Sequence, residues 1–324
     1  MKITHSVFAF ALGIALASHA GPSSAQGYPD RPIKIVNPFS PGGSSDALAR
    51  TIGLYLQDRI GQPVLVESRT GAGGIIGSDA VAKSPPDGYT LLVGTSFLPL
   101  AVHTHNRLPF DLLKDLAPVT LIGGTSMLLV AHPSLPAKSM TELIALAKSK
   151  PGELTYASPG TGTPNHLAME LLNEQVGISL RHVPYRSNPL AMNDVIAGHV
   201  PLLLDFVSTG APHVRSGAVR ALATTGQTRA KVLPEVPTMM EVGTSNFHPQ
   251  VWFAIFAPGG TPKGIVDKLN SNITAVLALP AVQERLDALG IDVSVAGPDE
   301  LAALIKSDLA IWGPVVDKSG MAKE

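Results

Sequence analysis

Short apolar runs alternate with longer amphipathic stretches along most of the chain. The runs are rich in Val, Ile and Leu and are bounded by Gly and Pro, a pattern typical of buried strands in an α/β protein. We predict strands at 33–36, 64–67, 90–93, 119–122, 127–131, 154–157, 180–183, 201–206, 219–224, 251–257 and 292–295. We predict helices at 45–60, 75–83, 140–149, 165–176, 189–197, 212–216, 262–279, 282–289 and 299–318. This repeating order predicts an α/β fold with mainly parallel sheets.

One arrangement occurs twice: a strand runs through Ser-Pro-Gly into a helix, first at 40–46 and again at 158–166. A helix N-terminus presents unpaired N–H groups and favours negative charge, and glycine lets the backbone approach a ligand closely. Neither loop contains Lys or Arg, so oriented N–H groups and hydroxyls would hold an anion. The hydroxyls are those of Ser40, Ser44, Ser45, Ser158, Thr161 and Thr163. Ordinary strand-to-helix turns are the alternative for each loop, but two copies favour two lobes closing on one anionic ligand.

Two side chains beside these loops leave alternatives open. Asp46 and Arg50 stand four residues apart on a predicted helix, so they form either a surface ion pair or a carboxylate at the pocket rim. His166 stands near a helix start, where it would contact a ligand or orient a neighbouring group.

The N-terminus reads as a secretory signal peptide covering residues 1–25. Lys2 precedes an apolar run at 7–17, and small residues stand at 23–25, so cleavage after Ala25 is expected. The run is shorter than the ~20 residues that span a bilayer. The sequence therefore predicts an exported protein without a membrane anchor.

Composition removes several classes of function. The chain has no cysteine, which excludes disulfides and thiolate metal sites. A net charge of −1 without a basic stripe argues against nucleic-acid binding. The glycines of 71–77 are spaced one residue too widely for a dinucleotide fingerprint, which leaves a tight turn. No nucleophile elbow, Walker A or zinc motif occurs, and His103/His105 and His166/Glu170 lack a third ligand, so we expect no enzyme, metal or cofactor.

At these loops the chain resembles a known family, the periplasmic substrate-binding proteins of tripartite tricarboxylate transporters, of the Bordetella-uptake-gene type. The resemblance extends over nearly the whole mature chain. The matching stretches are 28–33, 38–46, 69–74, 86–91, 182–185, 220–223, 233–238 and 257–262. Each stretch is a weak loop motif, and together they are specific.

The resemblance implies a type II-like Venus-flytrap fold of two lobes. Residues 26–126 and 251–324 would form lobe 1, and 127–250 would form lobe 2. It implies a carboxylate held between the two loops and an acidic side chain facing the cleft. The implied contacts are Phe39, Ser40, Gly42, Gly43, Ser44 and Asp46 in the first loop, Ser158, Gly160, Thr161, Gly162, Thr163 and His166 in the second, and Tyr185 and Asp205 beyond them.

One segment departs from the family pattern. After the strand at 90–93 the family usually shows small polar residues followed by Asn-Pro, whereas this chain has Thr95, Ser96, Phe97 and Leu98. Thr95, Ser96 and Phe97 are candidate ligand contacts, and Phe97 would suit a ligand with an apolar or aromatic part. The alternative is that Phe97 packs inward.

The leading hypothesis is a monomeric periplasmic protein that captures a small carboxylate and delivers it to the membrane subunits of such a transporter. A sensory protein that docks a receptor is one rival, and a secreted hydrolase is another, disfavoured by its missing motifs. The sequence does not identify the carboxylate.

Overall fold

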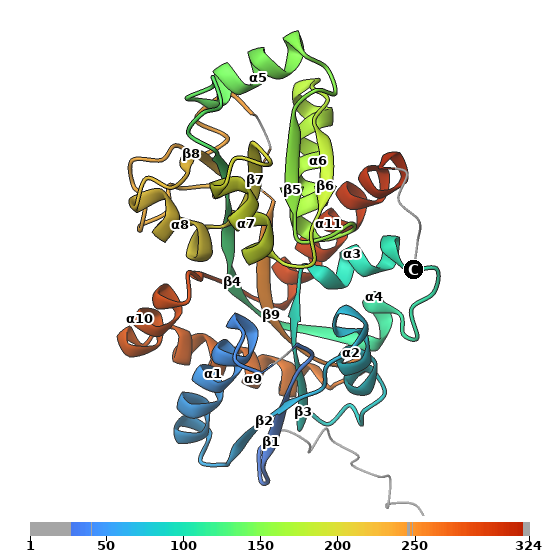
Figure 1. The fold of residues 1–324 in the computed structure, drawn as a ribbon. Coiled ribbons are helices and arrows are strands. Elements are labelled where there is room, and N and C mark those ends of the chain that lie inside the picture. Colours follow the sequence, from blue (N-terminus) through green and yellow to red (C-terminus); the bar gives the residue numbers. More distant parts are fainter. Residues whose placement is uncertain (1–26, 40, 245–246, 248, 320–324) are drawn as a thin grey trace, which may run out of the picture.

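The computed structural model describes residues 27–39, 41–244, 247 and 249–319 and consists of two lobes, one above the other in Figure 1. The signal peptide expected at 1–25 and the candidate Ser40 lie outside the described residues. The two-lobe α/β architecture is confirmed. Among the described residues, no helix is long and apolar enough to cross a membrane.

The elements follow the expected alternation for most of the chain. The strands are β1 (Ile33–Asn37), β2 (Val64–Ser68), β3 (Thr90–Thr95), β4 (Leu116–Ala131), β5 (Thr155–Ser158), β6 (Arg181–Pro184), β7 (Leu202–Phe206), β8 (Arg220–Thr224), β9 (Gln250–Pro258) and β10 (Asp292–Ala296). The helices are α1 (Ser44–Ile60), α2 (Ile75–Ala82), α3 (Phe97–Thr104), α4 (Leu112–Asp115), α5 (Met140–Ser149), α6 (Pro164–Val176), α7 (Asn188–Ile196), α8 (Val207–Arg215), α9 (Lys263–Leu277), α10 (Pro280–Ala288) and α11 (Pro298–Lys318).

The strands follow the order β2-β1-β3-β9-β4-β7-β5-β6, with β8 and β10 also paired to β4. Strands β1, β2 and β3 are mutually parallel where they pair, as are β5, β6 and β7. Every pairing of β4 and β9 is antiparallel. The pairing is therefore mixed rather than mainly parallel, because two long antiparallel strands lie at the centre.

Strand β4 connects the lobes. Its part from Leu116 to Ser126 pairs with β9 in lobe 1, and its part from Met127 to Ala131 pairs with β7 in lobe 2. The sequence analysis predicted two separate strands here, at 119–122 and 127–131. Instead Gly123 has a φ of +146°, and a Cβ there would lie 2.1 Å from the carbonyl oxygen of Asp292. Glycine thus allows β10 to approach closely while the strand continues.

Helix α1 shows how the sequence positions the first loop. Leu48, Ile52 and Leu56 recur at four-residue spacing and are fully buried against the lobe 1 core, which fixes the helix axis. The helix ends at Gly61, whose φ of +71° suits glycine. Burial of this face holds the opposite end of α1, at Gly43, against the space between the lobes.

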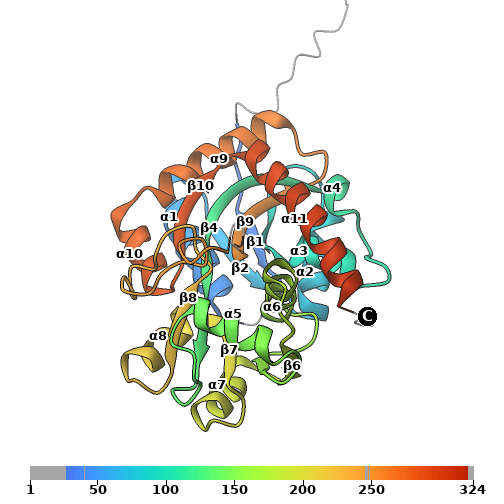
Figure 2. The same ribbon diagram turned by 90° about the horizontal axis from the view of Figure 1, so that it is seen from above.

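Helix α11 links the lobes on a second path. It begins in lobe 1, and Figure 2 shows it passing α3 toward α6. Trp312, Val315 and Val316 pack into the same core cluster as Leu167 and Leu172 of lobe 2. The expected assignment of 251–324 to lobe 1 therefore does not describe the last turns of α11.

Helices α3 and α4 are absent from the sequence prediction, and α8 was predicted too short. Helix α3 begins at Phe97, directly after its N-cap Ser96, is only eight residues long and lacks a side-chain cap hydrogen bond, so its apolar residues were not separated from the preceding strand. Helix α8 contains Pro212, which the sequence analysis took as a start rather than an interior residue.

Candidate functional site

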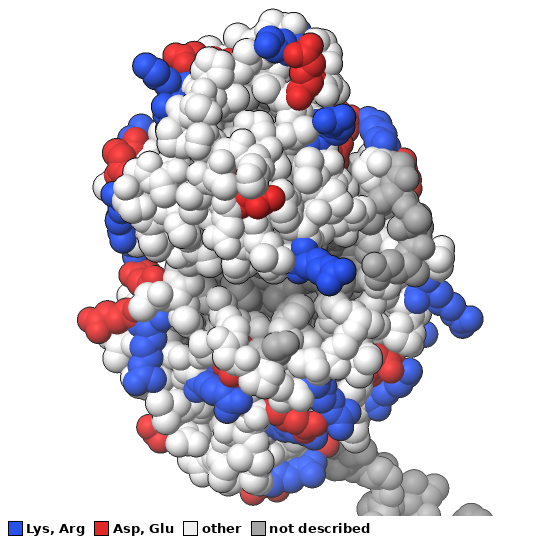
Figure 3. Space-filling model, viewed as in Figure 1, with Lys and Arg blue, Asp and Glu red and all other residues white. Residues whose placement is uncertain are grey.

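A cavity of about 690 Å³ lies between the lobes. Figure 3 shows the hollow that crosses the molecule between its two halves, with visible walls that are largely uncharged. The described lining residues are Phe39, Gly43, Ser44, Ser45, Gly73, Thr95, Ser96, Phe97, Thr104, His105, Thr125, Thr161, Gly162, Thr163, Pro164, Phe206, Ser208, Thr209, Val251, Phe253, Leu289 and Ile291. None of these described residues is Lys, Arg, Asp or Glu, so any ligand charge must be met by dipoles, hydroxyls or His105.

The first loop leads from β1 into α1 and offers N–H groups to this cavity. Gly43, Ser44 and Ser45 line it, and Gly43 is the N-cap of α1 without any side-chain cap. The first-turn N–H groups of a helix have no acceptor within the helix, so those of α1 remain available to a ligand. The side-chain amide of Asn37 forms two hydrogen bonds with the backbone of Phe39. Its Nδ2 donates to the Phe39 carbonyl oxygen at 2.9 Å and its Oδ1 accepts from the Phe39 N–H at 3.3 Å, which fixes the shape of the loop.

Asp46 supports the first loop from below instead of lining the cavity. Its Oδ2 accepts hydrogen bonds from the Gly42 N–H at 3.0 Å and from Arg50 Nε at 2.9 Å, and Ser68 lies 3.4 Å from Oδ1. The hydrogen bond from Arg50 is the main reason why the pKa of Asp46 lies below its usual value. Of the two alternatives for Asp46, the ion pair with Arg50 is the one observed. Gly42 does not line the cavity; it has a positive φ and donates its N–H to Asp46.

The second loop, between β5 and α6, uses most of its donors internally. The Gly160 N–H donates to Ser158 Oγ at 3.1 Å, and the Thr163 hydroxyl donates to the Gly160 carbonyl oxygen at 2.7 Å. The His166 N–H bonds Thr163 Oγ1, which caps the helix. Ser158, Gly160 and His166 therefore shape the loop and do not line the cavity. The sequence analysis assumed free N–H groups in both loops, and this loop departs from that expectation.

Thr161 is the part of the second loop that remains available. It is exposed, it lines the cavity with Gly162 and Thr163, and its hydroxyl has no partner among the described residues. The two loops thus differ: lobe 1 offers helix N–H groups and lobe 2 offers mainly a rigid loop tip.

Beneath the second loop, two histidine rings stack with centroids 3.9 Å apart. His182 Nε2 lies 2.6 Å from Ser158 Oγ, and the Gly162 N–H donates to His166 Nδ1 at 3.1 Å. A backbone N–H can only donate, so His166 Nδ1 carries no proton. Burial lowers the pKa of His166 to about 4, and burial together with His166 lowers the pKa of His182 to about 4. A neutral histidine pair therefore holds the loop, and His166 has the orienting role of its two alternatives.

The sequence analysis assigned no role to His182, Tyr156 or Glu170, which complete this group. Tyr156 donates to Glu170 at 2.5 Å and stacks on His182 with centroids 5.1 Å apart. Tyr156 and His182 occupy opposed positions of the parallel β5–β6 pair. The alternation of strand residues could have placed them on one face, but only pairing in the fold joins them.

Phe97 lines the cavity, which answers the alternative that it packs only inward. A Cβ on Gly73 would lie 2.5 Å from Phe97 Cζ, so the ring tip rests directly on the glycine backbone. A Cβ on Gly74 would similarly lie 3.3 Å from the ring of Phe39. The glycine turn after β2, read from sequence as a tight turn, makes room for two rings of the cavity wall.

Tyr185 and Asp205 lie near the cavity but do not line it. The Tyr185 hydroxyl donates to Asp194 at 2.7 Å. Asp205 is buried at the end of β7, directly before α8, and its Oδ1 has no partner among the described residues. Burial raises the pKa of Asp205, opposed by hydrogen bonds from Phe206 and Thr209.

The remaining walls come from segments that no sequence motif marked. Ser208 and Thr209 open α8, Val251 and Phe253 belong to β9, and Ile291 follows α10. These residues are far apart in sequence and carry no distinctive chemistry, so only the fold shows that they meet. No group of three or more His, Asp or Glu arranged for a metal occurs among the described residues.

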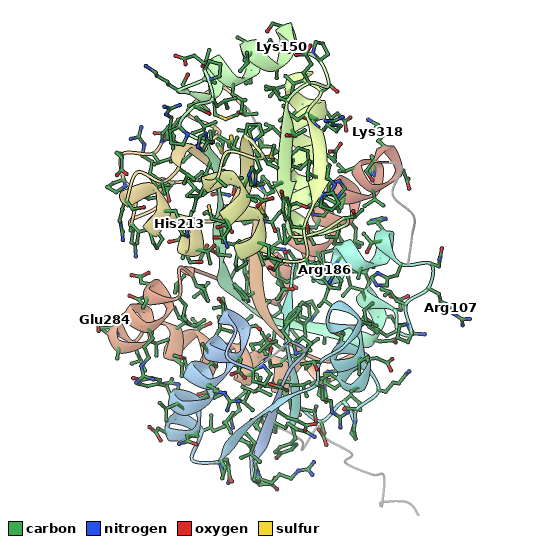
Figure 4. All side chains as sticks on the ribbon, viewed as in Figure 1. Arg107, Lys150, Arg186, His213, Glu284 and Lys318 are labelled. Carbon is green, nitrogen blue, oxygen red and sulfur yellow. The ribbon has the colours of Figure 1, made fainter. Side chains whose placement is uncertain are left out.

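Arg186 is a charged side chain at the mouth of the cavity. Figure 4 places it at the edge of lobe 2 that faces lobe 1, next to α3. It is exposed, and no hydrogen bond or ion pair joins it to another described residue. A cation in this position would attract anions toward the cavity.

Comparisons with known proteins agree with this geometry. The sequence model of the tripartite tricarboxylate transporter family receptor matches residues 48–321. Protein BugT of Bordetella pertussis is 40% identical over 322 residues, which cover 99% of this chain and 99% of that protein. The structure of R. palustris Rpa4515 with adipate has a TM-score of 0.74 at 32% identity and covers 91% of this chain and 99% of its own. MatC from Rhodopseudomonas palustris, with bound malate, has a TM-score of 0.70 at 32% identity and covers 89% of this chain and 100% of its own.

Proposed function

The chain belongs to the tripartite tricarboxylate transporter receptor family, and we propose that it captures a small carboxylate between its lobes and delivers it to a membrane transporter. The family and its structural neighbours are periplasmic solute-binding proteins. In the proposal the protein acts as a monomer in the periplasm after loss of residues 1–25. Residues 26–126 and most of 251–324 form lobe 1, and 127–250 form lobe 2.

One observation carries the proposal: helices from opposite lobes begin at the same uncharged cavity. Helix α1 of lobe 1 and helix α6 of lobe 2 both contribute their N-terminal loops to its lining. The positive end of a helix dipole stabilises an anion without a cationic side chain, and the effect is strongest where water is excluded. An anion bound there would also join the lobes, which is how a closing binding protein retains its ligand.

The neighbours support a carboxylate as that anion. Two of the similar structures, each 32% identical to this chain, are Rpa4515 with adipate and MatC with bound malate. Both compounds present carboxylates, whose two oxygens can each accept N–H donors. We propose that Gly43, Ser44 and Thr161 provide the contacts to the carboxylate, with Ser40 as a further candidate outside the described residues.

Binding without turnover is part of the proposal. Ser158 Oγ, 2.6 Å from His182 Nε2, is fully buried and bonded within its loop, so it has no access to a ligand in the cavity. The buried histidines hold the loop and are not exposed to the cavity lining. A nucleophile with such partners would need to leave its structural bonds before it could attack.

A thermal-shift and calorimetry screen tests the function. We expect carboxylates to bind 1:1, and ligand at ~100 Kd to stabilise the folded protein by about 2.7 kcal/mol. Amides of the same acids are the matched neutral controls. Preferential binding of the amides would overturn the anion proposal, and consumption of the ligand over hours would overturn binding without turnover.

Delivery is tested separately, by uptake of the identified ligand into cells that carry the membrane subunits with and without this protein. Uptake that depends on the protein supports transport. Unchanged uptake together with ligand-dependent binding to a receptor domain would favour the sensory alternative.

A further inference from the structure

The walls of the cavity are more apolar than a small polar acid requires. Four phenylalanines line it, together with three aliphatic side chains: Phe39, Phe97, Phe206, Phe253, Val251, Leu289 and Ile291. Its volume of about 690 Å³ is in the range of sites for organic ligands of moderate size. A small aliphatic acid with several polar groups, placed in this space, would leave some of those groups against rings and without partners.

Two of these rings are fixed in place. The tip of Phe97 rests on Gly73, and its N–H donates to Thr95 Oγ1 at 3.2 Å. Phe39 rests on Gly74 and is bonded through its backbone to Asn37. Because both rings are held by packing and by hydrogen bonds, they form a wall whose shape is present before a ligand arrives. Aromatic rings of a ligand would pack well against such a wall.

Two hydroxyls interrupt this apolar lining. Ser96 and Thr125 line the cavity, and they are only 6% and 8% exposed. Neither Ser96 Oγ nor Thr125 Oγ1 has a hydrogen-bond partner among the described residues. A buried hydroxyl without a partner costs about 1–3 kcal/mol, so a ligand group that bonds it recovers part of that cost.

Both hydroxyls lie beside the central strand β9. Thr125 of β4 is opposite Val251 of β9, and the Ser96 N–H donates to the carbonyl oxygen of Trp252, the next residue of β9. Ser96 and Thr125 therefore flank β9 from its two sides. We call Ser96 and Thr125 the floor hydroxyls.

The lack of charged lining residues limits the ligand further. No described lining residue is Lys, Arg, Asp or Glu, and His105 is the one titratable side chain in the described lining. A ligand ammonium would therefore lose its hydration without an opposite charge, and a second carboxylate would have His105 alone to meet it. The uncapped N-terminus of α1 and the hydroxyl of Thr161 compensate one carboxylate. The floor hydroxyls suit a neutral group, since each can donate or accept.

Resting on the proposed function, we propose that the ligand is a monocarboxylate with a ring-sized apolar body and a second, neutral hydrogen-bonding group, which the floor hydroxyls bind. Phe39 and Phe97 pack against the body, and Ser96 and Thr125 select the second group.

Calorimetry with benzoate and its 2-, 3- and 4-hydroxy derivatives tests this proposal, with malate and adipate as polar acids and benzamide as a neutral analogue. We expect at least one hydroxybenzoate to bind about tenfold tighter than benzoate, since one added hydrogen bond to a buried group contributes on that order. Thr125→Val and Ser96→Ala keep nearly the same shape without the hydroxyl, and each should reduce this advantage severalfold.

Thr224→Val is the matched control variant. Thr224 Oγ1 is likewise buried without a partner among the described residues, but Thr224 does not line the cavity. It should keep the preference for the hydroxylated ring. An equal loss in Thr224→Val would mean that the effect comes from packing, and this would overturn the role of the floor hydroxyls.

These ligands distinguish a failure of the proposed ring-shaped ligand from a failure of the proposed function. If no hydroxybenzoate binds tighter than benzoate, the second group is wrong. If malate or adipate binds tighter than every ring acid, the ring-sized body is wrong, whereas capture of a carboxylate stands. If benzamide binds tighter than benzoate and the polar acids do not bind, the proposed function itself is wrong.

Discussion

Gly290 of lobe 1 lies against Ser208 of lobe 2, so closely that a Cβ on Gly290 would be 2.6 Å from the Ser208 Cβ. Gly290 stands between Leu289 and Ile291, which line the cavity, and Ser208 lies in the first turn of α8, which lines it from the other lobe. The two backbones therefore meet at the cavity wall. The observed distance between the lobes on this side depends on the missing side chain.

Gly290→Ala should hold the lobes apart and weaken ligand binding by about tenfold, or ~1.4 kcal/mol. The added methyl group would clash with Ser208 Cβ, which is attached directly to the backbone and cannot rotate away. Gly260→Ala is the control, because Gly260 has a similar φ of +80° but open space around its Cβ position. Calorimetry measures affinity and small-angle scattering measures the opening. Equal effects of both variants would assign the loss to backbone strain instead.

Stability should fall as the pH is lowered from about 6.5 toward 4, because of His166 and His182. Burial lowers both pKa values to about 4 in the folded protein, so the unfolded chain binds protons first over this interval. The stabilisation is complete above pH 6.5, and on the order of 1–3 kcal/mol is lost by pH 4. Protonation of His166 Nδ1 also removes the acceptor for the Gly162 N–H, so affinity should decline with it.

His166→Gln should flatten this pH dependence, measured by urea unfolding at several pH values. The groups that face the pair are Tyr156, Ser158 and Glu170, whose carboxylate lies 4.0 Å from His166 Nε2. His199→Gln is the control, since His199 is exposed and pairs with Asp194 at the surface. An unchanged slope in His166→Gln would show that other groups cause the acid sensitivity.

Asp46→Ala should weaken all carboxylates alike and destabilise the fold by about 1–3 kcal/mol, because a buried acceptor of the Gly42 N–H is lost. From sequence alone, an acid beside an anion loop suggested a change in which carboxylate binds. The observed bonds instead indicate support of the loop. Asp267→Ala removes an exposed pair of the same spacing with Lys263 and should cost little. A changed ranking of carboxylates in Asp46→Ala would return Asp46 to the pocket rim.

The sequence predicted the two loops well because their signals are local. A strand, a Ser-Pro-Gly turn and a helix follow one another in the chain, and Ser44, Thr161 and Thr163 lie in the cavity lining. That they contact a ligand stays a prediction. The internal bonding of the second loop was not predictable, since it depends on His182, which β6 brings beneath β5. The position of Phe97 was ambiguous because Gly73, which receives its ring, lies in a turn after another strand.

Arg186→Gln should slow ligand association by about three- to tenfold at low salt and have little effect on dissociation. Arg186 is an exposed cation at the mouth, and its attraction for anions acts over distance (Figure 4). Lys150→Gln, at the far end of lobe 2, removes one positive charge with no such effect. Stopped-flow kinetics at several salt concentrations measure both. A loss that persists at high salt would indicate direct contact with the bound ligand.

The last prediction concerns whether both lobes hold the same carboxylate. Gly43→Val places a bulky side chain at the N-cap of α1, in a lining position whose φ of −79° any residue can adopt. Gly160→Val acts differently, since its φ of +147° strains the second loop and shifts Thr161. Each change alone should reduce affinity by about tenfold or more while the protein remains folded by circular dichroism.

The double variant decides the point. If both loops clamp one carboxylate, either change already prevents closure, and the two together should cost little more than one, because the losses of free energy are coupled. Independent sites would instead give additive losses. Parent-like affinity in a folded Gly160→Val protein would show that the second loop is only a turn, and the anion would then be held by the N-terminus of α1 alone.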